Sequence, residues 1–63
     1  MGTDLSDRQR LILKLVIQEY IRTGRAVGSK ALIDRYGLDV SPATVRNDMV
    51  ELEERSYLQH LHT

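Results

Sequence analysis

The chain has 63 residues, enough for one domain, and domains of this size bury only about 60% of the surface that the unfolded chain exposes. It contains no cysteine, so disulfide bridges and thiolate metal sites are excluded. Its nine basic and nine acidic residues cancel, and no apolar run reaches the roughly 18 residues that a membrane span needs. The opening residues, MGTDLSD, lack the basic and apolar regions of a signal peptide, so we expect a single cytoplasmic domain over residues 1–63.

The first predicted element is a long helix that begins after Ser6 and ends at Thr23. Ser6 is a favourable N-cap, and Gln9 follows three residues later, as in a capping box. Gly24 is predicted to end the helix because glycine adopts the left-handed conformation without penalty. Apolar residues recur at the spacings of one helical face, which we expect to pack on the core: Ile12, Leu13, Val16, Ile17, Tyr20 and Ile21. Leu11 and Leu15 fall at the edge of the polar side.

A second, shorter helix is predicted over residues 30–36. Ser29 is its expected N-cap and Gly37 its expected stop. Leu32, Ile33 and Tyr36 give this helix an apolar face. The connection GLDV then leads to the third helix.

The third predicted helix has the clearest start in the chain. Ser41 is the N-cap, and Pro42 occupies the first helical position, where its missing N–H group costs nothing. Val40, just before the cap, is placed to form a hydrophobic staple with Val45. The core-facing residues are expected to be Val45, Met49 and Leu52. The opposite, exposed face is expected to carry Ala43, Asn47, Val50 and Glu54, flanked by Thr44 and Arg46.

The last residues, SYLQHLHT, alternate in a way that predicts a short strand over residues 57–61. A lone strand is not stable in water, so this one needs a partner. The chain ends where the return strand of a hairpin would begin, which indicates a truncated C-terminal β-wing and a fragment of a longer protein. The expected fold class is therefore mainly α: a three-helix helix-turn-helix of the winged-helix type.

Two short helices joined by a glycine-containing turn are typical of the helix-turn-helix motif, whose second helix enters the DNA major groove. The front of the third helix fits this role, because small side chains let the backbone approach the bases. Asparagine can pair with adenine, arginine with guanine, and threonine or alanine can contact a thymine methyl group. We therefore predict base contacts by Ser41, Pro42, Ala43, Thr44, Arg46 and Asn47.

The charge distribution supports this interpretation. Residues 22–46 carry five basic and two acidic side chains, whereas residues 47–63 carry one basic and four acidic side chains. This asymmetry can mark a surface that meets a charged ligand in one orientation. The acids would then lie at the far end of the third helix, away from the DNA phosphates. We predict phosphate contacts, which position a protein without specifying sequence, by Arg22, Arg25, Ser29, Lys30 and Arg35.

The sequence resembles the N-terminal winged-helix domain of the HrcA family of bacterial heat-inducible transcription repressors. The most specific segments are YIRTGRAVGSK (20–30), RYGLDVSPATVRNDM (35–49) and the closing HT (62–63). The resemblance implies sequence-specific binding of double-stranded DNA at an inverted-repeat operator upstream of chaperone operons. It also implies a homodimer in the full-length protein and possible help from the chaperonin, while the isolated domain is expected to be a monomer.

The sequence departs from the family pattern at three places. The family usually has a glycine near the end of the third helix, where this chain has Arg55 and Ser56. It commonly has a proline before HT, where this chain has Leu61. The family continues into SAGR, a wing with an arginine suited to the minor groove, beyond the last residue of this chain.

Other functional classes have weaker support. His60 and His62 would share one side of a strand, but a metal site needs three or four ligands, so we expect no metal, no cofactor and no catalytic residue. The acids Glu51, Glu53 and Glu54 are better interpreted as a solvated helix end. The main alternative is a winged-helix module that binds protein instead of DNA. The neutral net charge favours it, but only Val50 offers an apolar anchor on the front face.

Overall fold

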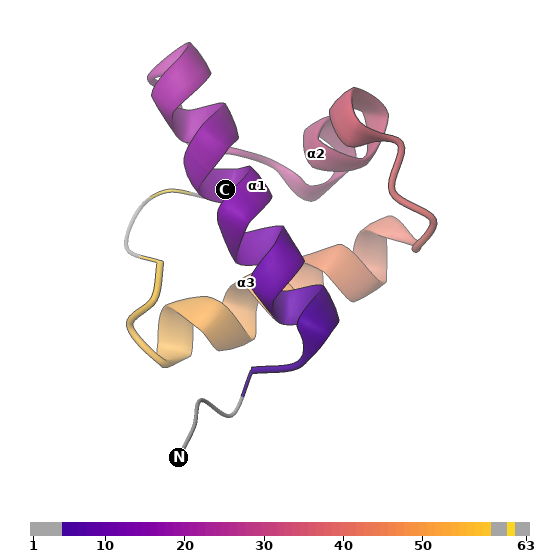
Figure 1. The fold of residues 1–63 in the computed structure, drawn as a ribbon, viewed down its shortest axis with the longest axis vertical. Coiled ribbons are helices and arrows are strands. Elements are labelled where there is room, and N and C mark those ends of the chain that lie inside the picture. Colours follow the sequence, from indigo (N-terminus) through magenta and orange to yellow (C-terminus); the bar gives the residue numbers. More distant parts are fainter. Residues whose placement is uncertain (1–4, 59–60, 62–63) are drawn as a thin grey trace.

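The computed structural model describes residues 5–58 and 61, and its three helices follow in the order α1 (Asp7–Thr23), α2 (Ser29–Tyr36) and α3 (Pro42–Glu54). Helix α1 runs along the long axis of the molecule, α3 crosses behind its lower half, and α2 lies beside its upper half (Figure 1). All three predicted helices are present, which confirms the predominantly α-helical helix-turn-helix fold.

Both ends of α1 form as the sequence predicts. The Ser6 hydroxyl accepts a hydrogen bond from the Gln9 amide at 3.1 Å, and the Gln9 side chain accepts one from the Ser6 amide at 3.2 Å. This reciprocal pair is the capping box, and it satisfies two backbone donors that the helix leaves unpaired. At the other end Gly24 has a φ of +70°, and its amide donates to the Tyr20 carbonyl at 2.7 Å.

The start of α2 differs from the prediction. Its N-cap is Gly28, in an extended conformation, and Ser29 is the first residue of the helix. The Gly28 carbonyl accepts the first helical hydrogen bond from the Leu32 amide at 3.1 Å, so the helix begins one residue earlier than serine capping predicts. No side chain caps this end. The predicted stop is confirmed, because Gly37 adopts a φ of +65°.

Helix α3 begins as predicted, with Ser41 as N-cap and Pro42 in the first turn. Its end is less usual. The C-cap is Arg55, at a φ of −89°, and the following residue, Ser56, has a φ of +68°. Ser56 therefore occupies the left-handed region where helices most often place a glycine.

The core lies between the three helices. Its fully buried members include Leu32 from α2 and the residues of α3 that were predicted to face inward, Val45, Met49 and Leu52. Ile12 and Val16 contribute from α1. Leu58, beyond the end of α3, is also fully buried and closes the core behind that helix. The segment that follows α3 as far as Leu58 thus belongs to the folded unit.

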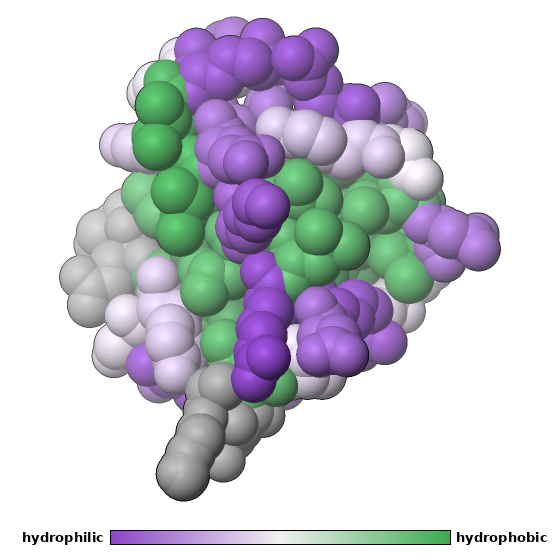
Figure 2. Space-filling model, in the orientation of Figure 1, coloured by the Kyte–Doolittle hydropathy of each residue, from purple (hydrophilic) through white to green (hydrophobic). Residues whose placement is uncertain are grey.

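The buried face of α1 is rotated relative to the prediction. Ile21 is 76% exposed and Ile17 is 38% exposed, whereas Leu15 is buried together with the polar Gln9 and Glu19. Figure 2 shows the result as hydrophobic surface on both sides of a polar ridge that follows α1. The expectation of a core face through Ile17 and Ile21 was wrong, because Gln9 and Glu19 find hydrogen-bond partners on α3 and α2 and can face inward.

The predicted strand over residues 57–61 falls partly outside the described residues, since 59 and 60 are not among them. Residues 57, 58 and 61 are not in a strand. However, the Val27 amide donates to the Leu61 carbonyl at 2.8 Å, so the segment between α1 and α2 supplies a backbone partner for the end of the chain. Within the described part of the chain, no helix is long and apolar enough to cross a membrane.

Candidate nucleic-acid interface

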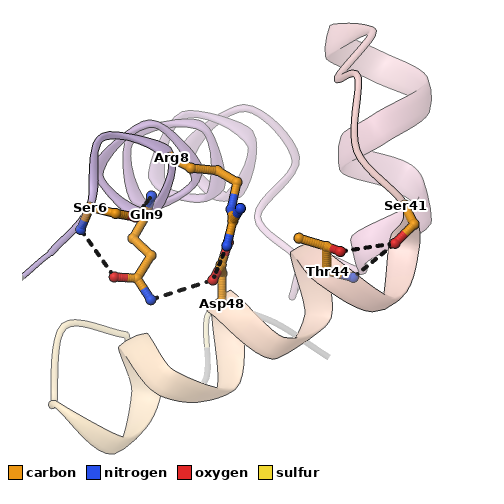
Figure 3. A network of polar contacts seen from close by, with 6 residues as sticks. All are labelled: Ser6, Arg8, Gln9, Ser41, Thr44 and Asp48. Carbon is orange, nitrogen blue, oxygen red and sulfur yellow. Dashed lines mark hydrogen bonds and ion pairs between the residues drawn. The ribbon is translucent and has the colours of Figure 1, made fainter.

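The first turn of α3 is held by its own cap. The Ser41 hydroxyl accepts a hydrogen bond from the Thr44 amide at 3.2 Å and lies 3.0 Å from the Thr44 hydroxyl (Figure 3). Because these two side chains bond to each other, the backbone of the front turn has a defined shape before any ligand binds. Five of the six predicted base-contact residues are exposed; the sixth, Thr44, is half-buried.

Two side chains on this front are suited to read bases. Arg46 and Asn47 are both exposed, and neither side chain forms a hydrogen bond or ion pair with any other described residue. A free guanidinium can donate two hydrogen bonds to guanine, and a free carboxamide can both donate to and accept from adenine. The front of α3 therefore exposes two side chains whose hydrogen-bonding groups no other described residue uses, next to the capped helix start.

A carboxylate on α3 is removed from this surface. Asp48, which directly follows Asn47, is only 4% exposed and points toward α1. Its Oδ2 atom lies 2.6 Å from Nε of Arg8, and its Oδ1 atom lies 3.3 Å from Nη2 of the same arginine. Gln9 adds a third contact, from its Nε2 atom to Oδ1 at 3.4 Å. The first acidic side chain within α3 is thus buried and paired.

Sequence reasoning missed this bridge between α1 and α3. The hydrogen bonds and charge of Asp48 raise the pKa of the Arg8 guanidinium above its usual value. A signal was present in the sequence, since Asp48 falls at the i+3 position after Val45, on the same face as Met49 and Leu52. A carboxylate at a core-facing helical position requires a partner, and buried charges are almost always paired.

A second polar cluster joins the ends of α1 and α2 and takes in two of the predicted phosphate contacts. Glu19 forms an ion pair with Arg22 at 2.6 Å and with Arg35 at 3.7 Å, and it accepts a hydrogen bond from the Tyr36 hydroxyl at 3.2 Å. The hydrogen bond from Arg22 lowers the pKa of Glu19, although burial of the carboxylate opposes this shift. The charges of Arg22 and Arg35 are therefore partly compensated within the protein.

The other predicted phosphate contacts are less constrained. Arg25 and Lys30 are exposed, and their side chains have no ion-pair partner within the described ranges. Ser29 is half-buried in the first turn of α2, whose first amides no side chain caps. Arg25 and Gly28 border an open groove of about 310 Å³ at the junction of α1 and α2, which is also lined by Glu19, Arg22, Thr23, Ala26, Val27 and Ala31. Among the described residues, this end of the molecule thus combines two unpaired cations with a helix start that has no side-chain cap.

The two sets of predicted DNA contacts occupy separate parts of the fold. The base-contact residues lie at the start of α3, whereas the phosphate-contact residues lie around the ends of α1 and α2. No hydrogen bond or ion pair between described residues connects one set with the other. Over residues 5–58 and 61 no three histidine or acidic side chains come together as metal ligands would. His60 and His62 lie outside the described residues.

Comparisons with known proteins identify a family and several relatives of this chain. A family model described as the DeoR-like helix-turn-helix domain matches residues 8–63. Three relatives are named heat-inducible transcription repressor HrcA. Those of Thermomicrobium roseum and Roseiflexus are each 60% identical to this chain over all 63 of its residues, and that of Cutibacterium acnes is 54% identical over 59 residues. No solved structure matches.

The chain spans less than a fifth of the length of these relatives, since 63 residues make up 18% of the Thermomicrobium repressor and 59 make up 17% of the Cutibacterium repressor. The similarity therefore concerns a helix-turn-helix domain and not a whole repressor. Because the family model matches residues 8–63, the chain belongs to the DeoR-like helix-turn-helix domain family, and it is similar in sequence to part of the repressors named HrcA.

Proposed function

We propose that this chain is the sequence-specific DNA-binding domain of a transcription repressor that acts on an inverted-repeat operator, most simply one that controls chaperone genes. The observation that carries the proposal is the front of α3, where Arg46 and Asn47 are exposed and have no partner among the described residues, beside the helix cap formed by Ser41. The relatives named as heat-inducible repressors support the regulatory role.

In the proposed complex α3 enters the major groove with its first turns toward the bases. Arg46 and Asn47 contact base edges, while Ser41, Pro42, Ala43 and Thr44 allow close approach of the backbone. Lys30 and Arg25 contact phosphates, together with Ser29 and the uncapped amides at the start of α2. Arg22 and Arg35 contribute to the positive potential from within their pairs with Glu19.

The proposed operator architecture implies two domains on one duplex. A two-fold dimer holds two half-sites about 34 Å apart, one helical turn, and gains affinity because both domains bind at once. This gain requires the dimer of a full-length repressor, in which a chaperonin can further regulate the active form. We propose that the isolated 63-residue chain is a monomer that binds a half-site weakly.

The second candidate is a winged-helix module that binds protein. Its supporting observations are the zero net charge and the exposed apolar residues of α1 and α3, among them Ile21 at 76% and Val50 at 42% exposure. DNA binding is favoured because the front of α3 carries hydrogen-bonding side chains and no aromatic anchor.

A titration followed by NMR distinguishes the two candidates. The chain is first used to select binding sequences from a randomised duplex pool, and the selected half-site is then titrated beside a scrambled duplex at low salt. DNA reading predicts shifts in residues 41–50 and 27–31 that are larger with the selected duplex. Equal shifts with both duplexes would mean phosphate binding alone, and the absence of shifts would favour the protein-binding module.

A further inference from the structure

We propose that Asp48 is a positioning residue, which acts through Arg8 and Gln9 to fix the orientation of α3 against the start of α1 and thereby sets the sequence preference of the α3 front. This inference rests on the proposed DNA-binding function and adds to it a set of residues that do not touch DNA.

The contacts form one continuous network across the two helices (Figure 3). The Gln9 side chain accepts a hydrogen bond from the Ser6 amide and donates one to Asp48, so the cap of α1 is connected directly to the middle of α3. Arg8 approaches both oxygens of the same carboxylate, at 2.6 and 3.3 Å. Both carboxylate oxygens of Asp48 are therefore engaged by donors from the first turn of α1.

The apolar residues on the inner face of α3 provide weaker directional control. Val45, Met49 and Leu52 are fully buried, but the hydrophobic effect that buries them is non-directional. Hydrogen bonds depend steeply on distance and angle, so a buried carboxylate with three donors restricts how α3 can rotate about its axis. Retention of a buried ionic group for structural specificity is known in some proteins.

The position of Asp48 couples this restriction to the DNA-facing residues. Asp48 directly follows Asn47 and lies two residues after Arg46, but its side chain is buried toward α1, whereas Arg46 and Asn47 are exposed. A small rotation of α3 that loosens the bridge would therefore move both base-reading side chains. Base recognition is sensitive to such movement, because bidentate pairs require both hydrogen bonds to form together.

The test exchanges the amide and the carboxylate between Gln9 and Asp48. Asp48→Asn keeps the shape of the side chain but places an amide group where Arg8 and Gln9 need an acceptor. In Gln9→Glu alone, two carboxylates would repel each other at positions 9 and 48, whose side chains are 3.4 Å apart in the wild type. The double variant restores a donor and an acceptor across this contact, and glutamate at this position still completes the capping box with Ser6.

Two measurements are made on each variant. Fluorescence anisotropy gives the affinity for the selected duplex and for a scrambled one, and residual dipolar couplings give the orientation of α3 relative to α1 without DNA. We expect Asp48→Asn to rotate α3 and to lower the preference for the selected duplex about tenfold, as for the loss of one bidentate base contact. Binding to the scrambled duplex should change less than twofold, and the double variant should recover most of the preference.

Several outcomes would overturn the inference. These are an unchanged helix orientation in Asp48→Asn, an equal loss of affinity on both duplexes, or no recovery in the double variant. Should Asp48→Asn fail to fold, Arg8→Lys serves the same test, because it keeps the charge and loses the two-point contact. If the wild-type chain selects no sequence from the pool, the proposed function fails, while the dipolar couplings still decide whether Asp48 orients α3.

Discussion

The Glu19 carboxylate accepts a hydrogen bond from the Tyr36 hydroxyl at 3.2 Å and so joins the last turns of α1 and α2. The same carboxylate forms ion pairs with Arg22 and Arg35, which makes it a shared acceptor for three side chains. It lies with only 7% of the residue exposed. The ionised carboxylate of Glu19 thus connects α1 with α2, and the stability of the fold should depend on its ionisation.

We predict that the contribution of Glu19 to stability is lost in acid. Because the pKa of Glu19 is lower in the folded chain than its ordinary value of 4.5, the ionised form stabilises the fold above that value. The contribution disappears as the pH falls through the lowered pKa. Thermal unfolding of wild type and Glu19→Gln should therefore differ at pH 7, and the difference should shrink in acid as Glu19 of the wild type becomes protonated.

The exposed Asp34→Asn variant on α2 is the control for a general change of charge. The stability of this variant should stay close to that of wild type both at pH 7 and in acid, as expected for an exposed surface position. A Glu19→Gln variant as stable as wild type at pH 7 would contradict the role of the carboxylate as a shared acceptor.

Arg46→Ala and Asn47→Ala should each weaken binding to the selected duplex and relax preference at one base position. The expected cost is about 1–3 kcal/mol per lost base contact. Both side chains are exposed and unpaired in the described structure, so the melting temperature should hardly change. Anisotropy with the selected duplex and circular dichroism melting measure the two effects. Full-strength binding by both variants, or unfolding of either, would refute the assignment of α3 as the reading helix.

Lys30→Ala should instead weaken binding to all duplexes alike. A phosphate contact carries no sequence information, and its loss should reduce the slope of log affinity against log salt by about 1. Lys14→Ala, an exposed lysine on the outer side of α1, is the matched control and should leave the slope unchanged. A loss for Lys30→Ala that is confined to the selected duplex would contradict the phosphate role.

The sequence predicts the helices of this fold well because their ends have local causes. The capping box of Ser6 and Gln9, the proline at the start of α3 and the left-handed Gly24 and Gly37 act within a few residues, so no tertiary information is needed. The inward face of α3 was also predictable, because its apolar residues follow helical spacing without interruption. The exposure of Arg46 and Asn47, which we propose as base contacts, follows directly from that face.

The polar bridges could not be predicted in the same way. Hydrophobic periodicity assigns polar residues to solvent, but Glu19 and Asp48 face inward because donors from other parts of the chain neutralise them. Those partners are up to 40 residues distant, as with Arg8 and Asp48, and only the assembled fold brings them together. For the same reason the periodic stripe of α1 overestimated the burial of Ile17 and Ile21.

The end of α3 offers a stabilising substitution. Ser56 has a φ of +68°, a conformation that costs a non-glycine residue roughly 1 kcal/mol. Glycine adopts the left-handed region freely. The Ser56 amide donates to the Glu53 carbonyl at 2.9 Å, and that backbone bond would persist in the variant. We therefore expect Ser56→Gly to raise the free energy of unfolding by about 0.5–1 kcal/mol in urea denaturation.

The neighbouring Arg55→Gly variant tests the reason for this gain. Arg55 has a φ of −89°, where glycine relieves no strain, and its guanidinium contacts Glu51 at 3.1 Å. Glycine at position 55 should therefore lower stability through the greater freedom of the unfolded chain and the loss of that contact. If both glycine variants changed stability in the same direction, the left-handed conformation of Ser56 would not be the source of the effect. If Ser56→Gly raised stability and Arg55→Gly lowered it, the backbone strain would be located at Ser56, where the chain leaves α3 toward Leu58.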